Sequence, residues 1–464
     1  MCIRDRSLDY HLVLSVLLAA FLSIAFYAFL RTLGIEQILA LAAAAVLLVF
    51  PMSDSTRLWS TGSQINLFIG LYLVAAVIAI YGRRRFGPKA TGPAIATQAL
   101  ASALAVTAVA GYEIVAPAVL LSFGLYRWAG GRGGSAWRWA LDAVPTMLVL
   151  IFFTSKFGNG GAALGTELAA NARLVADGAL WVLSYTFYPS RTMSRWTVAA
   201  GLLGILFIIL LVRRIGAPTP DREAIVRWLR PILLSIGGIA IGYLMIVPAA
   251  DRYPLYAPGV QNRTNCFAAL GFSTLTVFVL AAVAAMLVAA LPRLSEQTRK
   301  QLRGGLAAVL VLGLLAVYTV RISEDADRWV EATDIQKQVL ETTQALVPSP
   351  PPDATFFTSP APGYSAPSVP IFGGGGNNDA VGAFKVAYDS DEMRAFPLFD
   401  GVEGICGRTG MSTPDAGNSE TEYGKAILVD MRGARVYRPR NQAECVRDTE
   451  AMKPFGPLNL SEAW

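Results

Sequence analysis

The sequence is poor in the side chains that most often bind transition metals or act in nucleophilic catalysis. Its 464 residues include one histidine, His11, and four cysteines, and no Cys-x-x-Cys pair occurs. A tetrahedral zinc site needs several such ligands, and a Ser-His-Asp triad needs a histidine beside its nucleophile. These scarcities argue against a zinc enzyme and a histidine-based hydrolase. No metal ligands are predicted, and a divalent metal is left open as a cofactor.

Charged residues are scarce as well. Only 16% of the residues are charged, whereas 54% are hydrophobic and the mean hydropathy is +0.47. This composition is typical of a protein that crosses the membrane several times. We therefore predict an all-α polytopic membrane protein with a small C-terminal extracytoplasmic α+β domain, and the lipid bilayer as one partner.

The charges that are present are unevenly distributed. Residues 1–321 hold 27 Lys and Arg against 12 Asp and Glu, whereas residues 322–464 hold 12 against 21. A basic excess can indicate nucleic-acid binding, but these arginines fall in short loops between apolar runs, where orientation in the membrane explains them. No nucleic-acid motif occurs, and no nucleic-acid partner is predicted.

Ten apolar runs are long enough to cross a hydrocarbon core of ~30 Å. One set of alternate loops between them carries 17 Lys and Arg, and the opposite set carries six. Because cytoplasmic loops are enriched in Lys and Arg, both ends of the chain are predicted to lie outside the plasma (inner) membrane. The predicted spans are residues 10–31, 35–52, 65–82, 93–110, 113–128, 140–157, 195–213, 231–249, 265–291 and 304–321.

The first six residues, MCIRDR, differ from the apolar run that follows them. They resemble the in-frame translation of a common transposon-derived sequencing tag, and such segments are set aside before the fold is considered. We interpret residues 1–6 as a non-native scar, with a native juxtamembrane hexapeptide as the alternative. The first interpretation implies that native sequence begins near Ser7 and that an upstream part is missing.

The chain beyond the last predicted span has a different character. Residues 322–346 form a charged linker helix, and residues 347–383 are rich in Pro and Gly, which disfavours long regular elements. In the small domain of residues 384–464, the stretches KVAYDS, AILVDM and ARVYRP are predicted to be short strands. Cys406 and Cys445 lie there, on the side of the membrane where disulfides persist, and we predict a bond between them, with two free thiols as the alternative.

Glu113 is the first candidate for chemistry, because an ionisable group at membrane depth is costly. It lies beside Tyr112 at the predicted outer turn between two short apolar runs, which could also be one kinked hairpin. A carboxylate there could orient a cation, a sugar hydroxyl or an arginine. The alternative is an ion pair or hydrogen bond that only closes the hairpin.

A second group of candidates lies in the outer loop PAADRYPLYAPGVQNRTN. Arg252 and Arg263 flank Tyr256 there, near the predicted outer surface of the membrane. Arginine presents a planar fork of donors suited to phosphate, and tyrosine suits the interface or the face of a sugar. A lipid-linked phosphate would fit these residues, and ordinary contacts with lipid headgroups are the alternative.

Asp54 and Arg57 form a third group just outside the second predicted span, in PMSDSTRLWSTGSQINL. Their spacing of three residues would allow them to pair on a helical turn. Asp54 is a weak catalytic candidate and Arg57 a candidate substrate ligand. A solvated loop is the alternative interpretation.

Two stretches together resemble the GT-C superfamily of membrane glycosyltransferases. FYAFLRTLGIEQILALAAAAVLLVFPMSDSTRLW resembles an early pair of spans that ends in a proline and a polar outer loop. ALASALAVTAVAGYEIVAPAVLLSF resembles a glycine-containing hairpin with a charged residue at its outer turn. The resemblance covers roughly residues 10–321 and concerns the layout of the spans.

The resemblance implies a polyprenyl-phosphate-linked sugar as donor and an envelope acceptor on the outer face. A carboxylate in the first large outer loop would act as general base on the acceptor hydroxyl, and an arginine or a metal would hold the phosphate. That loop is expected upstream of Ser7, so the main catalytic carboxylate is not assigned to this chain. A transporter or flippase and a non-catalytic envelope protein of the same fold are the alternatives.

Overall fold

The structure is a computed structural model that divides into two compact units. The helical unit comprises Leu14–Ala257 and Gln261–Ser323, and the C-terminal unit comprises Glu324–Trp464 with Met1–Val13 and Pro258–Val260. The residues that the structure describes are 7–59, 62–130, 133–157, 164–187, 222–250, 255, 259–289, 291, 294–359, 364–366, 369–372, 378–398, 404–413 and 420–452.

Five helices in the described residues are long and apolar enough to cross a membrane. Large apolar side chains on their surfaces, such as Ile24, Leu100 and Leu312, are exposed, as expected where lipid replaces water. The structure therefore supports a membrane protein. The five are Val13–Thr32 within α1 (Ser7–Thr32), α4 (Gln64–Phe86), α5 (Gly92–Gly111), Ala268–Val288 within α12 (Ala268–Ala289) and α13 (Glu296–Leu346).

The prediction of ten spans is confirmed only in part. Two of the predicted runs form shorter apolar helices, α2 (Gln37–Leu48) and the Pro231–Leu244 part of α11 (Arg222–Leu244). Residues 140–157 lie within α8 (Ser135–Phe157), and residues 195–213 lie outside the described residues.

The predicted span over residues 113–128 is wrong as a continuous helix. The helix α5 ends where Tyr112 takes an extended backbone, with φ −156° and ψ 104°. This break falls between the predicted spans 93–110 and 113–128, whereas the interruption inside residues 113–128 falls at Leu121, where φ is −92° and ψ is 4°. The chain therefore continues as three short pieces, η3 (Glu113–Val115), α6 (Ala116–Leu120) and α7 (Ser122–Gly130).

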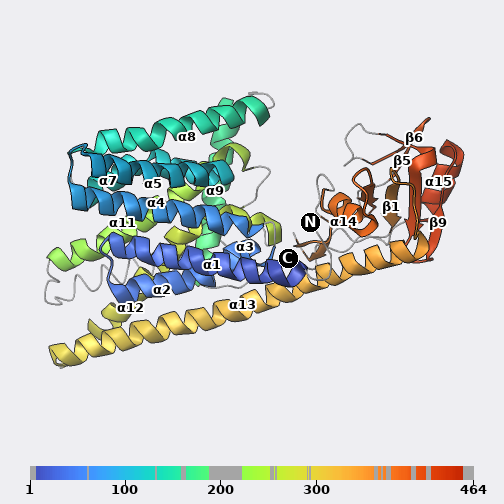
Figure 1. The fold of residues 1–464 in the computed structure, drawn as a ribbon. Helices are drawn as coiled ribbons and strands as arrows, with labels where there is room; N and C mark the ends of the chain where they lie inside the picture. Colours follow the sequence, from blue (N-terminus) through green and yellow to red (C-terminus); the bar gives the residue numbers. More distant parts are fainter. Residues whose placement is uncertain are drawn as a thin grey trace. The chain divides into compact units, whose positions relative to one another are not determined.

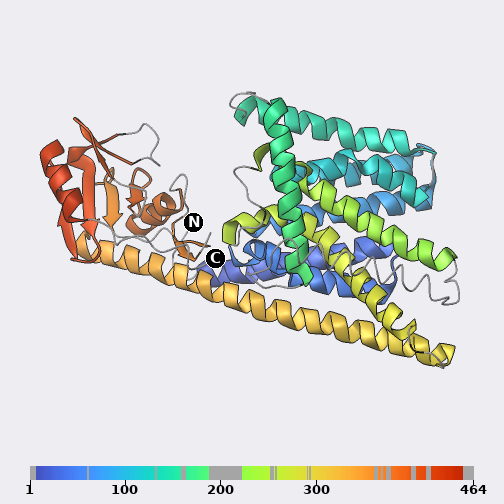
Figure 2. The same ribbon diagram turned by 180° about the vertical axis from the view of Figure 1, so that it is seen from behind.

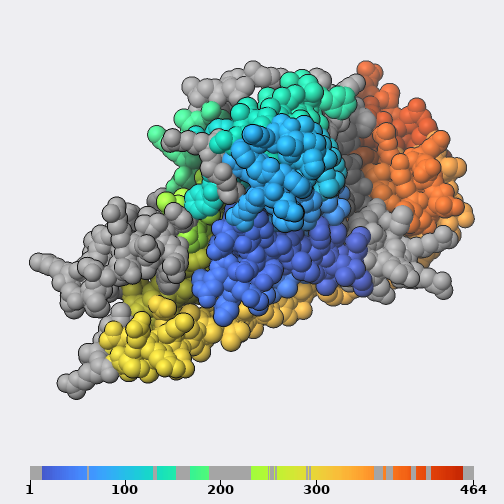
Figure 3. All heavy atoms as spheres, turned by 60° about the vertical axis from the view of Figure 1, so that its left-hand side comes forward, coloured from blue at the N-terminus to red at the C-terminus, as the bar shows by residue number. Residues whose placement is uncertain are grey.

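Glycines allow the helices of this unit to approach one another closely. The helices α4, α5 and α8 lie side by side (Figures 1 and 2). A Cβ atom on Gly70 of α4 would lie 2.4 Å from the ring of Phe21, and one on Gly82 would lie 2.5 Å from Thr97. Small residues are favoured at helix contacts in membranes for this reason. In the space-filling view, the dark-blue and light-blue helices form neighbouring parts of one face (Figure 3).

The C-terminal unit is built on a mixed sheet with strand order β4-β1-β8-β9. The central strand β1 (Thr355–Ser359) pairs in parallel with β4 (Arg394–Pro397) and β8 (Ala426–Asp430). An antiparallel edge strand, β9 (Arg435–Tyr437), follows β8. Because side chains alternate along a strand, β1 buries apolar side chains on both faces of the sheet.

Two hydrophobic clusters cover the faces of this sheet. Phe356 of β1 packs with Phe384 and with residues of α13, whereas its neighbour Phe357 packs with Leu428 and Met411. The rest of the unit consists of α14 (Asn378–Tyr388), α15 (Gln442–Ala451) and short strands, namely β2 (Tyr364–Ala366), β3 (Val369–Pro370), β5 (Ile405–Cys406), β6 (Gly410–Ser412) and β7 (Thr421–Glu422).

The strand predictions for this region have mixed outcomes. AILVDM and ARVYRP contain β8 and β9, so these two predictions are confirmed. The prediction of a strand at KVAYDS is wrong, because Lys385 to Tyr388 form the last turn of α14. This helix buries Ala380 and Phe384, four residues apart on one face, against the sheet. The proline- and glycine-rich residues 347–383 supply the central strand.

The predicted disulfide is confirmed. Cys406 in β5 and Cys445 in α15 are bonded, with their Cα atoms 5.9 Å apart. The bond joins elements whose sequence separation is 39 residues, and Cys445 is fully buried. It therefore links α15 to β5, an edge strand of a second sheet with strand order β5-β6-β7.

Candidate functional site

Three separately predicted groups of residues meet at one end of the helical unit. Arg57 lies in α3 (Ser55–Leu58), and Asp54 is the residue before this helix. Tyr112 follows α5, and Arg263 lies in η5 (Gly259–Asn265). The backbone N–H of Ser55 donates to the side chain of Asn262 at 3.2 Å, across 207 positions of sequence. We refer to Asp54, Arg57, Tyr112, Asn262 and Arg263 as the α3–η5 cluster.

Asp54 is buried at the centre of this cluster, with 1% of its surface exposed. The side-chain amide of Asn262 donates to Asp54 Oδ1 and also, at 3.4 Å, to the carbonyl of Pro51. Asp54 therefore joins η5 to the loop after α2. Sequence analysis did not predict the role of Asn262, whose only signal was the pattern Asn-Arg-Thr.

Arg57 binds the end of α2. Its Nη2 donates to the carbonyl of Phe50 at 2.5 Å, and its Nη1 donates to the carbonyl of Leu47 at 3.5 Å. Both carbonyls also accept backbone N–H groups, so the guanidinium adds a second donor to each and opposes the negative end of the helix dipole. Burial lowers the pKa of Arg57 to about 10, and the charge of Asp54 partly offsets this effect. Arg57 is thus engaged in holding the loop.

Arg263 is the arginine of the cluster that lies against aromatic side chains. Its guanidinium carbon is 5.2 Å from the ring centroid of Trp59, a cation–π geometry. The charge of Arg263 also acts on Tyr112, whose hydroxyl interacts with the thiol of Cys266. Arg263 is half-buried, so it remains accessible from one side.

Tyr112 and Cys266 are held in their neutral forms. Burial raises the pKa of Tyr112 well above its usual value, and the charge of Glu113 adds to this shift although the charge of Arg263 opposes it. Burial likewise raises the pKa of the Cys266 thiol. Tyr112 therefore keeps its proton at neutral pH and can serve as a hydrogen-bond donor.

Glu113 differs from Asp54 in exposure. It is the first residue of η3 and its side chain is exposed, next to Tyr112. Of the two candidate carboxylates, Glu113 is therefore the one open to an incoming hydroxyl group. Two other predicted ligands, Arg252 and Tyr256, lie outside the described residues.

A small cavity lies beside Arg57, the one member of the α3–η5 cluster that borders it. A cavity of about 10 Å³ is bordered by Ser53, Arg57, Asn66 and Cys266. This volume is near the lower limit for a single water molecule. A larger ligand would therefore lie on the exposed sides of Arg263 and Glu113, towards lipid or solvent.

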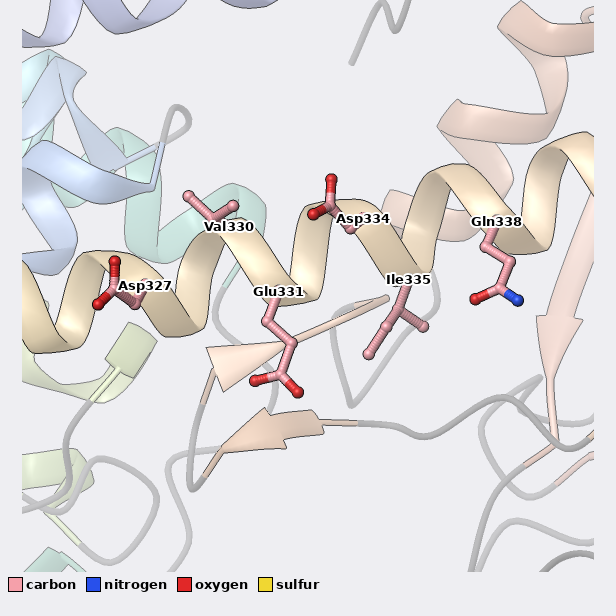
Figure 4. A pocket seen from close by; sticks show the side chains of 6 residues that line it. All are labelled: Asp327, Val330, Glu331, Asp334, Ile335 and Gln338. Carbon is pink, nitrogen blue, oxygen red and sulfur yellow. The ribbon is translucent and has the colours of Figure 1, made fainter.

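No metal centre is formed by the side chains that the structure describes. Among them, no three His, Cys, Asp or Glu side chains lie together as a set of metal ligands. A hollow along α13 is bordered by three carboxylates, but all of its residues come from this one helix, and Glu331 points away from Asp327 and Asp334 (Figure 4). The other residues that line it are Val330, Ile335 and Gln338.

Comparison of the chain with protein-family models, with curated proteins and with solved structures finds no match in any of the three. Any function assigned to the chain therefore depends on its own residues and their geometry.

Proposed function

We propose that this chain is a membrane glycosyltransferase of the GT-C type. It would transfer a sugar from a polyprenyl-phosphate donor to an envelope acceptor on the outer face of the membrane. The observation that carries the proposal is the position of Arg263, which is half-buried against Trp59 and close to Tyr112. This group combines a cation with aromatic and hydroxyl side chains, as binding of a sugar phosphate requires.

The location of Arg263 supports a lipid-linked donor. It lies a few residues before α12, and Tyr112 follows α5 directly, so both lie at the ends of candidate spans. The phosphate of a lipid carrier lies at that depth, while its chain remains in the hydrocarbon. Arginine can bind phosphate through two parallel N–H donors, which would stabilise the leaving group as the sugar is transferred.

Glu113 is the proposed general base among the described residues. A base must reach the acceptor hydroxyl, and the exposed carboxylate of Glu113 can do so whereas Asp54 is buried against Asn262. The Cys406–Cys445 disulfide supports an extracytoplasmic C-terminal unit, because disulfides persist outside the cytoplasm. Together these features favour an enzyme of the plasma (inner) membrane that acts on its outer side.

The test uses the full chain reconstituted in lipid nanodiscs with polyprenyl phosphate, monitored by native mass spectrometry. Arg263→Ala is expected to weaken lipid-phosphate binding at least tenfold. Arg263→Lys is expected to retain only part of the binding, because lysine keeps the positive charge but lacks the planar fork of donors. Lys300→Ala in α13 is the control, since Arg263 precedes the candidate span α12 and Lys300 follows it, at the other end of that helix. Unchanged binding by Arg263→Ala would refute the phosphate role.

Transfer is tested separately from binding. With a radiolabelled lipid-linked sugar, Glu113→Gln is expected to bind the donor normally but to transfer the sugar at least 100-fold more slowly. Movement of the lipid-linked sugar between leaflets without transfer would instead indicate a flippase. Neither binding nor transfer by the unaltered chain would indicate a non-catalytic envelope protein.

A further inference from the structure

A buried carboxylate lies in the helical unit away from the α3–η5 cluster. Asp142 of α8 has 3% of its surface exposed and accepts hydrogen bonds from four side chains. The donors are Ser102 Oγ at 2.5 Å, Gln98 Nε2 at 2.9 Å, Ser122 Oγ at 3.2 Å and the hydroxyl of Tyr126. Sequence analysis placed Asp142 within a predicted span and gave it no role. We call these five residues the Asp142 cluster.

All four donors to Asp142 are neutral groups. They come from two neighbouring helices, Gln98 and Ser102 from α5 and Ser122 and Tyr126 from α7. Ser102 lies midway along α5, a candidate membrane span. Neutral donors lower the cost of burying a carboxylate but do not remove its charge, and a charge in the membrane interior is costly without a counterion.

The guanidinium of Arg138 makes no direct hydrogen bond to Asp142 among the described side chains, although the charges of the two groups act on each other. Arg138, one helical turn before Asp142, donates from Nη1 to Gln98 Oε1 at 3.1 Å and from Nη2 to the carbonyl of Gly87 at 3.3 Å. Its guanidinium carbon also lies 4.5 Å from the ring centroid of Trp137. The hydrogen-bond path from Arg138 to Asp142 therefore passes through the amide of Gln98. The charge of Arg83, in the last turn of α4, also acts on Arg138.

A small cavity lies next to the carboxylate. It has a volume of about 10 Å³, and the residues that border it include Tyr72, Ser122, Tyr126 and Asp142. The rest of the wall is apolar and includes Ala101 and Ala105. This volume is close to the minimum for one water molecule, a species similar in size to a dehydrated sodium ion. Carboxylate and hydroxyl oxygens are suitable ligands for a hard cation.

We propose that the Asp142 cluster binds one small monovalent cation, either a sodium ion or a proton. Either species supplies a single positive charge that neutralises the buried carboxylate, next to the hydroxyl groups of Ser122 and Tyr126 that border the cavity. A sodium ion would occupy the cavity, whereas a proton would reside on Asp142 itself. This site is independent of the proposed glycosyltransferase activity and lies on different helices from Arg263.

The sodium arm of the test follows thermal unfolding of the full chain in detergent micelles. Sodium chloride is exchanged for choline chloride at constant ionic strength, and tryptophan fluorescence reports Tm. A bound sodium ion is expected to raise Tm by about 3–5 °C at roughly 100 times its Kd. Asp142→Asn should abolish the sodium-dependent shift in Tm, and Ser122→Ala should weaken sodium binding while keeping the fold. The control is Asp177→Asn, on the exposed face of α9 (Leu164–Phe187), which should leave the sodium-dependent shift in Tm unchanged.

The proton arm uses infrared difference spectroscopy of the same preparations. A protonated Asp142 would give a carboxylic C=O band at neutral pH, which Asp142→Asn removes and Asp142→Glu shifts in frequency. A sodium-dependent Tm shift that Ser122→Ala weakens would assign the site to sodium. The band without a sodium effect would assign it to a proton, and absence of both would overturn the proposal.

Discussion

The contact between Asn262 and Asp54 provides a quantitative test of how the α3–η5 cluster is held together. Replacing Asn262 by Ala removes the donor to Asp54 Oδ1 and the acceptor for Ser55 N–H, and leaves the rest of η5 in place. The bond to the carbonyl of Pro51 is long, at 3.4 Å, and adds little. The main effect is therefore on Asp54, which is almost fully buried.

The magnitude follows from the two strong contacts. A hydrogen bond to a charged, buried acceptor contributes about 2 kcal/mol and a neutral one about 1 kcal/mol. Asn262→Ala is therefore expected to lower the free energy of unfolding by about 3 kcal/mol. Since part of this loss arises from Asp54 left without its donor, Asp54→Ala and Asn262→Ala should not be additive, with a coupling energy of about 1.5 kcal/mol.

The assay is reversible unfolding by SDS in mixed micelles, monitored by tryptophan fluorescence for the two single variants and the double variant. Thr107→Ala, which removes an exposed hydroxyl of α5, is the control and should change the free energy by less than about 0.5 kcal/mol. A loss below about 1 kcal/mol for Asn262→Ala would show that Asn262 does not secure Asp54. Strict additivity would lead to the same conclusion.

Two further predictions concern packing in the helical unit and the covalent link in the C-terminal unit. Gly271→Val should lower the free energy of unfolding by about 2–3 kcal/mol, because a Cβ there would lie 2.5 Å from the carbonyl oxygen of Ser235 across the α11–α12 contact. Gly237→Val, at a position where a Cβ would meet nothing within 4 Å, is the matched control, and equal losses in the two variants would contradict the close approach. Replacing Cys406 and Cys445 by Ser should destabilise the C-terminal unit by about 4 kcal/mol in the chain-entropy model, as judged by limited proteolysis with and without the bond. Equal proteolysis rates would show that the disulfide, whose cysteines are 39 residues apart, does not stabilise the C-terminal unit.

Sequence reasoning was most successful where the signal is local. Apolar runs such as residues 65–82 and 93–110 correspond to α4 and α5, because a helix in lipid satisfies its backbone within its own segment. The disulfide was also predicted, since Cys406 and Cys445 are the only cysteines in the polar region. Boundaries failed where a short break interrupts an apolar run, as between Tyr112 and Ser122.

The misassigned strand has a comparable cause. KVAYDS contains Val and Tyr, which are common in strands, but its first four residues belong to a helix that begins at Asn378. The feature that distinguishes a helix from a strand here, burial of Ala380 and Phe384 on one helical face, lies upstream of KVAYDS. Conversely, Thr355 to Ser359 form the central strand within a proline- and glycine-rich segment, because burial against β4 and β8 outweighs the local composition.

The sequence by itself determined the class of the protein, its membrane-length helices and the candidate residues Asp54, Arg57, Tyr112, Glu113 and Arg263. Only the tertiary structure decided which of these lie together, that Asp54 is buried against Asn262, and that Asp142 collects four neutral donors. The physical reason is the range of the interactions. Hydropathy and helical hydrogen bonding act within a few residues, whereas a contact across 207 positions depends on how whole helices pack.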